Sequence, residues 1–115
     1  MTDAILVLIK SNPLESHRPV EAIRIALGLA SGDHTVVIVL LNQTPLLLAD
    51  DTEDLVDGDI LQKYLPVFKE MGQTFFVEEG SLHAHPIEGS DYKIHAVSFD
   101  KITEMIRQAG RFFIF

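Results

Sequence analysis

Continuous apolar runs alternate along this chain with repeats of apolar residues at helical spacing. Residues 4–9 form one apolar run that ends at Lys10, and residues 35–41 (TVVIVLL) form a longer, β-branched run. Runs without polar alternation are typical of strands that are covered on both faces of a parallel sheet. Shorter strands are predicted at three further places, residues 74–77, 93–97 and 112–115.

Helical spacing of apolar residues predicts three main helices between these strands. The first has Pro19 in its first turn, Ser16 or His17 as its cap, and Gly32 as its end. In the second, the apolar repeat runs from residue 60 to residue 71. Pro66 lies inside that repeat, so we expect a kink or a split into two short helices.

The last helix is predicted to be capped by Ser98 and to end at Gly110, with Ile102 on its core face. Two segments are less regular. Residues 46–57 are interpreted as a short helix followed by a loop, and residues 82–87 as a helical turn or an extended loop.

The alternation of strands and helices predicts an α/β fold. Crossovers between the parallel strands are expected to be right-handed, and helices are expected to cover both faces of the sheet. We therefore expect a three-layer sandwich with a mostly parallel five-stranded sheet. No linker or low-complexity tract interrupts the pattern, and residues 1–115 are expected to form a single domain.

The composition narrows the classes of partner. The formal net charge is −8 at pH 7 and the few Lys and Arg residues are scattered, so direct nucleic-acid binding is not expected. The first apolar run is too short for a signal peptide or a membrane span, which favours a cytoplasmic protein without a membrane partner. The chain has 0 cysteines, which excludes disulfides and thiolate metal sites, and we expect no cofactor.

Much of the negative charge lies in one short segment. We interpret this segment as a solvated loop with helix-start residues rather than as a metal or partner site. The six acidic residues are Asp50, Asp51, Glu53, Asp54, Asp57 and Asp59.

Ligands of such folds bind outside the carboxyl ends of the strands, near the switch in strand order. Three loops are expected there, after the strands predicted at 4–9, 35–41 and 74–77. The residues in these loops with suitable side chains are Asn12, His17, Asn42, Glu78, Glu79, Ser81 and His83.

The third loop also contains a possible metal pair. In an extended segment, His83 and His85 would lie on the same side and, with Glu78 or Glu79, could bind a divalent metal. The remaining histidines, His34 and His95, lie at strand positions and are interpreted as structural. The terminal Phe112, Phe113 and Phe115 are interpreted as core and interface residues.

A serine-dependent hydrolase is another hypothesis for this loop. Ser81, with His83 or His85 and with Glu79, could serve as nucleophile, base and orienting group. The G-x-S-x-G turn that presents such a serine is absent, and a serine between a strand and a helix is more typical of a cap.

Three segments carry a resemblance to a known family. Residues 21–29 (EAIRIALGL) resemble the EA-x-R-x-ALGL helix of DsrE/DsrF-like proteins. Residues 76–82 (FVEEGSL) resemble the DsrF/TusC branch, where a similar strand runs into a Ser-Leu helix start. Residues 113–115 are similar to the aromatic C-terminal strand of that branch. The resemblance extends over nearly the whole chain, with the elements in matching order.

The resemblance implies an α/β sandwich, assembly into trimers or hexamers, and a role in sulfur relay. Such relay serves tRNA 2-thiouridine synthesis or dissimilatory sulfur oxidation. In DsrE and TusD the acceptor cysteine lies just after the third strand, where residues 77–81 of this chain hold none. The DsrF/TusC branch resembles this chain in lacking that cysteine.

The resemblance therefore implies a non-catalytic subunit. It would form a homo-oligomer or a hetero-oligomer with a cysteine-bearing DsrE-type subunit. The alternative is a stand-alone small-ligand or metal-binding homo-oligomer that uses His17, Asn42, Glu79, His83 and His85.

Overall fold

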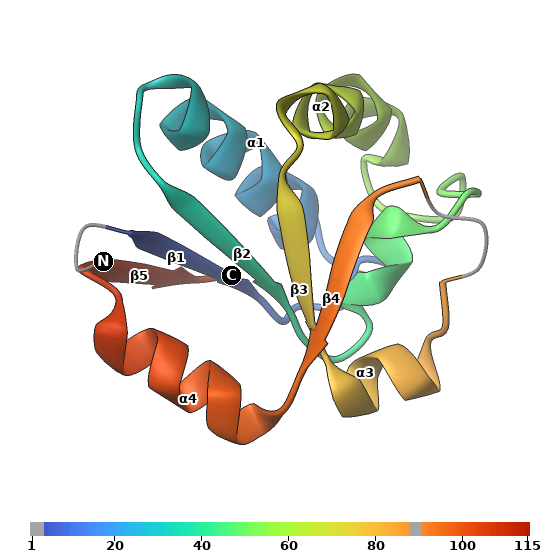
Figure 1. Cartoon of the computed structure of the whole chain (residues 1–115). Coiled ribbons are helices and arrows are strands. Elements are labelled where there is room, and N and C mark those ends of the chain that lie inside the picture. Colours follow the sequence, from blue (N-terminus) through green and yellow to red (C-terminus); the bar gives the residue numbers. More distant parts are fainter. Residues whose placement is uncertain (1–3, 88–90) are drawn as a thin grey trace.

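A computed structural model describes residues 4–87 and 91–115 of the chain (Figure 1). Five strands form one parallel sheet in the order β4-β3-β2-β1-β5. The strands are β1 (Ile5–Ile9), β2 (Val36–Leu40), β3 (Thr74–Glu78), β4 (Lys93–Val97) and β5 (Arg111–Ile114). The predicted α/β class and the five-stranded sheet are confirmed, and every strand pair in the described ranges is parallel.

The two longest apolar runs of the sequence form the centre of the sheet. Every residue of β1 is buried, and β1 pairs with β2 from Ile5↔Val36 to Ile9↔Leu40. Since side chains alternate along a strand, Ile5 and Val7 face one side of the sheet and Leu6 faces the other. The sheet thus divides the core into two hydrophobic clusters.

The larger cluster lies beneath three elements on one face of the sheet. These are α1 (Arg18–Ser31), the 3₁₀ helix η1 (Thr44–Leu48) and α2 (Gly58–Met71). Figure 1 shows α1 and α2 above the sheet. The fully buried ring of Phe68 from α2 meets the ring of Phe75 from β3 edge-to-face, with centroids 5.7 Å apart.

The smaller cluster lies beneath a single helix on the other face, α4 (Phe99–Gln108). As predicted, Ser98 caps this helix by accepting a hydrogen bond from the Lys101 N–H, and Ile102 is buried. The short helix α3 (Glu79–Ala84) follows β3 directly, so residues 82–84 take the helical alternative, whereas residues 85–87 lie beyond the helix. No helix in the described ranges is long and apolar enough to span a membrane.

The predicted split of the second helix is wrong, because α2 is continuous over Gly58–Met71 with Pro66 inside it. A proline inside a helix removes its own backbone donor, here the one that would reach the Gln62 carbonyl, and its ring crowds that carbonyl. Pro66 is exposed, so water can satisfy that carbonyl, while Leu61, Leu65 and Phe68 remain buried on the opposite side.

Exposed ion pairs on the helices add local order. Lys69 on α2 donates to Asp91 at 2.9 Å, and this hydrogen bond raises the pKa of Lys69. On α1, the hydrogen bond from Arg24 lowers the pKa of Glu21. Such solvent-exposed pairs contribute little to stability, so the fold rests on its two apolar clusters.

The strand order brings three loops to one edge of the sheet. From β1 to β4 each strand is added beside the previous one, and the chain then crosses to the free side of β1 to form β5. Because all strands run in the same direction, Lys10, Asn42 and the end of β3 lie at the same carboxyl edge.

The start of α2 is packed against the acidic loop so closely that only glycine fits. An added Cβ at Gly58 would lie 2.1 Å from the Thr52 carbonyl oxygen, which is backbone and cannot rotate away. We expect Gly58→Ala to lower the free energy of unfolding by about 1–3 kcal/mol in urea denaturation. The matched control is Gly28→Ala in α1. An added Cβ there meets nothing within 4 Å, and alanine favours the helix by about 0.5–1 kcal/mol. Equal effects of the two substitutions would contradict this packing.

Candidate functional site

The turn from β3 into α3 is held by the side chain of Glu78. Glu78 is the last residue of β3 and the N-cap of α3. Its carboxylate accepts hydrogen bonds from the backbone N–H groups of Gly80 and Ser81. The first N–H groups of a helix have no partner within the helix, so this carboxylate satisfies two of them and places negative charge at the helix start.

Ser81 is enclosed in the same network. Its side chain is buried, its hydroxyl donates to Glu78 Oε1 at 2.9 Å, and its Oγ accepts from the Asn42 N–H at 2.7 Å. The expectation that Ser81 caps the helix is therefore wrong, because the cap is Glu78 and Ser81 is the third helical residue. The Glu78 side chain reaches forward from the N-cap to the Gly80 and Ser81 N–H groups, whereas in a capping box the N-cap is serine or threonine.

Asn42 extends the network to the other two strand ends. It has a left-handed backbone with φ of 58°, a conformation that asparagine tolerates better than most residues. Its side chain donates to the Lys10 carbonyl at 3.1 Å. Beside it, the buried Thr44 hydroxyl lies within hydrogen-bond distance of the Ile9 and Leu41 carbonyls. The ends of β1, β2 and β3 are therefore joined by side-chain hydrogen bonds. We call this group of hydrogen bonds, made by Asn42, Thr44, Glu78 and Ser81, the edge network.

An open cavity of about 360 Å³ lies against this network. Its walls come from the ends of β2 and β3 and from α3. The lining residues are Asn42, Gln43, Glu78, Gly80, Ser81, Ala84 and His85. At its inner wall the Glu78 carboxylate and the Ser81 hydroxyl already bond to each other.

Of the predicted site residues, the structure brings Asn42, Glu78 and Ser81 together in one hydrogen-bonded group. The predicted residues outside this group are Asn12, His17, Glu79 and His83. Asn12 accepts from the Leu14 N–H within its own loop, and His17 occupies the N-cap position of α1 without a side-chain hydrogen bond. Glu79 and His83 are exposed on α3.

The geometry of α3 does not favour the hypotheses that need histidine. His83 is helical and His85 follows the helix, so the extended segment that would place both on one side is not formed. Within residues 4–87 and 91–115, no three His, Asp or Glu residues are grouped so that they could hold a metal ion. Ser81 is bonded to Glu78 rather than to a histidine, and its burial leaves no exposed nucleophile.

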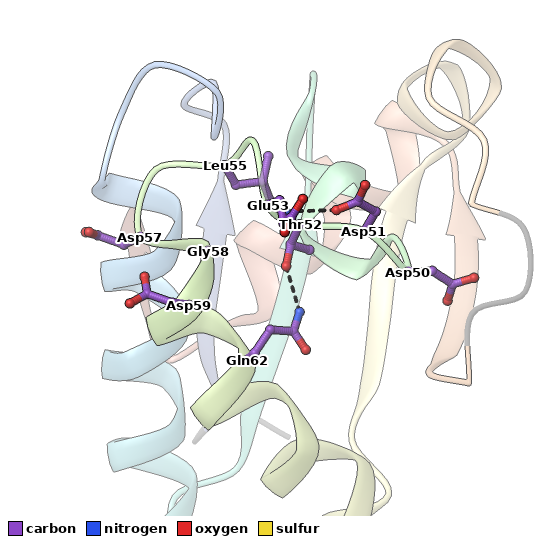
Figure 2. Close-up of a pocket in the computed structure, with 9 residues that line it drawn as sticks. All are labelled: Asp50, Asp51, Thr52, Glu53, Leu55, Asp57, Gly58, Asp59 and Gln62. Carbon is purple, nitrogen blue, oxygen red and sulfur yellow. Dashed lines mark hydrogen bonds between the residues drawn. The ribbon is translucent and has the colours of Figure 1, made fainter.

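A second, larger cavity of about 560 Å³ is lined by the acidic loop and the start of α2 (Figure 2). Asp51 accepts from the Glu53 N–H, and Gln62 of α2 donates to the buried Thr52 hydroxyl at 2.8 Å. The other carboxylates point in different directions: Asp57 and Asp59 lie at the helix start and Asp50 points away from them. These contacts agree with a solvated loop anchored to α2.

Two further residues at this edge, Gly80 and Gln43, lie in the predicted loops but were not among the predicted site residues. Gly80 leaves room for the carboxylate, because an added Cβ would lie 3.0 Å from Glu78 Oε2. Gln43 lines the cavity. The sequence signal was present for Gly80, since a glycine between an acidic strand end and a serine permits a side chain to fold over the turn.

The fold of this chain is similar to that of a solved α/β protein with a DsrE/DsrF/TusC-like fold. The crystal structure of the ychN protein from E. coli superposes with a TM-score of 0.76, covering 100% of both chains at 12% sequence identity. No protein-family model matches the sequence, and no curated protein matches it. The resemblance stated from the sequence is thus confirmed for the fold.

Ser81 can be tested as a structural residue. Ser81→Ala leaves the Asn42 N–H without its acceptor and Glu78 without one of its donors. We expect a loss of about 1–2 kcal/mol in the free energy of unfolding. Ser31→Ala at the exposed end of α1 is the matched control and should change stability by no more than about 0.5 kcal/mol. Unchanged stability of the Ser81 variant in urea denaturation would contradict the network.

Proposed function

We propose that this chain is a non-catalytic subunit of a DsrE/DsrF-like assembly that takes part in sulfur relay. It binds a cysteine-bearing partner and does not carry sulfur itself. The observation that carries the proposal is the Glu78 carboxylate, which closes the turn after the third strand. The resemblance noted above places the acceptor cysteine of the sulfur-carrying relatives in this turn.

The chemistry of the turn supports this role. Sulfur transfer requires a thiolate as nucleophile, and the sequence contains 0 cysteines. Ser81 offers no substitute, because a serine hydroxyl is not ionised near neutral pH and cannot carry a persulfide. The N–H groups of Gly80 and Ser81, which could stabilise a sulfur anion, are already bonded to Glu78.

The outer side of α3 is available for a partner. Glu79 and His83 are exposed, and neither forms a hydrogen bond with the edge network. A rigid turn with exposed polar groups can therefore form one wall of a site whose thiol comes from another chain. The ordered network beneath it holds that wall in place without taking part in chemistry.

The experiment combines this chain with a cysteine-bearing DsrE-type subunit from the same organism. Light scattering at micromolar concentration should give the mass of a complex, and labelled sulfur supplied to the complex should appear on the partner alone. A partner with its cysteine replaced by serine is the control and should assemble without label. A strict monomer, both alone and with the partner, would show that the chain is not such a subunit.

The contribution of the exposed side of α3 to sulfur transfer can be measured separately. In the assembled complex, the double substitution Glu79→Ala and His83→Ala should slow sulfur transfer through the partner about tenfold or more. Glu53→Ala in the acidic loop is the matched control, since it removes an exposed carboxylate away from α3. Equal transfer rates in both variants would limit the role of this chain to holding the partner.

The open cavity beside the network favours a second candidate function, the binding of a small polar ligand by a stand-alone oligomer. Gln43 and His85 line the cavity outside the Glu78–Ser81 pair and are the groups available to such a ligand. A screen of thermal stability against small polar metabolites and divalent ions tests it. A stabilising compound should lose its effect in the Gln43→Ala, His85→Ala double variant, and the absence of any stabilising compound would count against this function.

A further inference from the structure

The last strand is apolar but uncovered. All four residues of β5 are exposed, and the exposed fractions of Phe112, Phe113 and Ile114 are 50%, 43% and 47%. Strands of a parallel sheet are normally covered on both faces. The interpretation of Phe112 and Phe113 as core residues is therefore wrong, whereas their interpretation as interface residues stays a prediction.

The exposure affects both faces of the sheet. Pairing with β1 places Phe112 opposite Leu6 and Phe113 opposite Val7. Leu6 belongs to the cluster beneath α4 and Val7 to the cluster beneath α1. Phe112 and Ile114 therefore extend one face and Phe113 extends the other, and β5 lies beyond the cover that either helical layer provides.

Among the residues that the structure describes, β5 pairs with β1 alone, so its outer edge also presents unpaired backbone groups. Phe115 turns its backbone toward β1, because its N–H donates to Leu8 and its carbonyl accepts from Lys10. Backbone direction alternates along a strand, so Phe113 also bonds toward β1 while Phe112 and Ile114 point outward. Arg18 reaches only the outward Ile114 carbonyl, at 3.4 Å, and that oxygen can accept a second hydrogen bond.

We propose that β5 pairs antiparallel with β5 of a second copy of this chain, about a two-fold axis at Phe113, to give one continuous sheet. In this register Phe112 lies opposite Ile114 of the other copy, and the two exchange both of their outward hydrogen bonds. The two Phe113 residues form the non-hydrogen-bonded pair, in which side chains approach most closely. One face then carries Phe112 and Ile114 of both copies, and the other face carries the Phe113 pair at its centre.

The sequence of the edge favours a second copy over an unrelated chain. Residues 112–114 are self-complementary about Phe113 in both side-chain type and backbone direction, as a two-fold interface requires. The opposite edge of the sheet, β4, carries exposed Lys93 and His95, which discourage strand addition. Between Phe112 and Ile114 there is no charge that would oppose pairing.

The size and charge of this interface predict a reversible dimer. Each half-exposed side chain contributes roughly 100 Å². Together, the exposed apolar side chains of the two β5 strands thus bury about half of the surface area that a stable protein–protein interface buries. Each copy carries a net charge of −8, so the copies repel at low ionic strength. Salt shortens the range of this repulsion, and raising NaCl from about 0.1 M to about 1 M should tighten the dimer.

Sedimentation velocity at increasing concentration tests the pairing on the intact chain. Phe113→Lys places two ammonium groups opposite each other at the axis and should weaken the dimer about tenfold or more. Met71→Lys is the matched control, since it puts the same charge on an exposed apolar position at the end of α2. Equal dimer affinity of the two variants would overturn the proposal.

Amide exchange reports the register independently of any substitution. In the monomer the Phe113 amide is bonded to β1 and should exchange slowly, while the outward amides of Phe112 and Ile114 should exchange fast. Above the dimer dissociation constant these two amides should become protected by about tenfold or more. A dimer that leaves both amides unprotected would place the interface elsewhere and overturn the proposal.

This inference deepens the proposed function, because it names one of the contacts through which the subunit assembles. The two can fail separately. A chain that stays monomeric at all salt concentrations but binds the cysteine-bearing subunit would overturn β5 pairing and leave the proposed function standing. A chain that dimerises through β5 but never binds that subunit would do the reverse.

Discussion

The structure depends on covering both faces of a very apolar parallel sheet with unequal amounts of helix. On one face, α1, η1 and α2 bury the larger cluster. On the other, one helix of 10 residues covers Leu6, Leu8 and Val39. Hydrophobic burial is the main driving force of folding, so the helices lie over the central strands first. The consequence is the uncovered β5, which is apolar enough to be buried but lies beyond both layers.

The carboxyl edge of the sheet is stabilised by a different means. Polar side chains there are satisfied by one another: Glu78 by α3, Ser81 by Glu78 and Asn42, and Asn42 by Lys10. No buried side-chain nitrogen or oxygen in the described residues lacks a hydrogen-bond partner. A satisfied network of this kind fixes geometry and leaves little unused bonding capacity for chemistry. It suits a structural wall better than a catalytic centre.

Much of this fold could be predicted from the sequence, because long apolar runs and helical repeats report burial directly. The predicted strand at 93–97 matches β4, and the run at 35–41 contains β2. Pro66 misled the prediction, since its exposed position inside α2 depends on tertiary packing. Sequence pattern could not show that residues 112–114 lie at an edge, because strand order decides whether an apolar strand is covered.

The candidate site was predictable in part. Parallel topology alone brings Asn42 and Glu78 to the same edge. The assignment of the helix cap to Ser81 followed the usual preference for serine. Glu78 takes that position because Gly80 leaves room for its carboxylate and because Asn42 offers the serine hydroxyl a backbone donor from another strand. The choice of Glu78 rather than Ser81 as the helix cap thus depends on the contact between Asn42 and Ser81. These residues lie 39 positions apart, and local sequence does not report such a contact.

The proposed pairing of β5 has a consequence for the edge network. A two-fold axis through Phe113 makes the strands of the two copies run in opposite directions, so their carboxyl edges lie at opposite ends of the joined sheet. The two Glu78–Ser81 turns of such a dimer are then too far apart to form one site together. Under the proposed function each turn meets a different chain, and a two-fold dimer through β5 leaves both turns free to do so. In these two proposals, self-association and the binding of a cysteine-bearing partner therefore use separate surfaces of the same subunit.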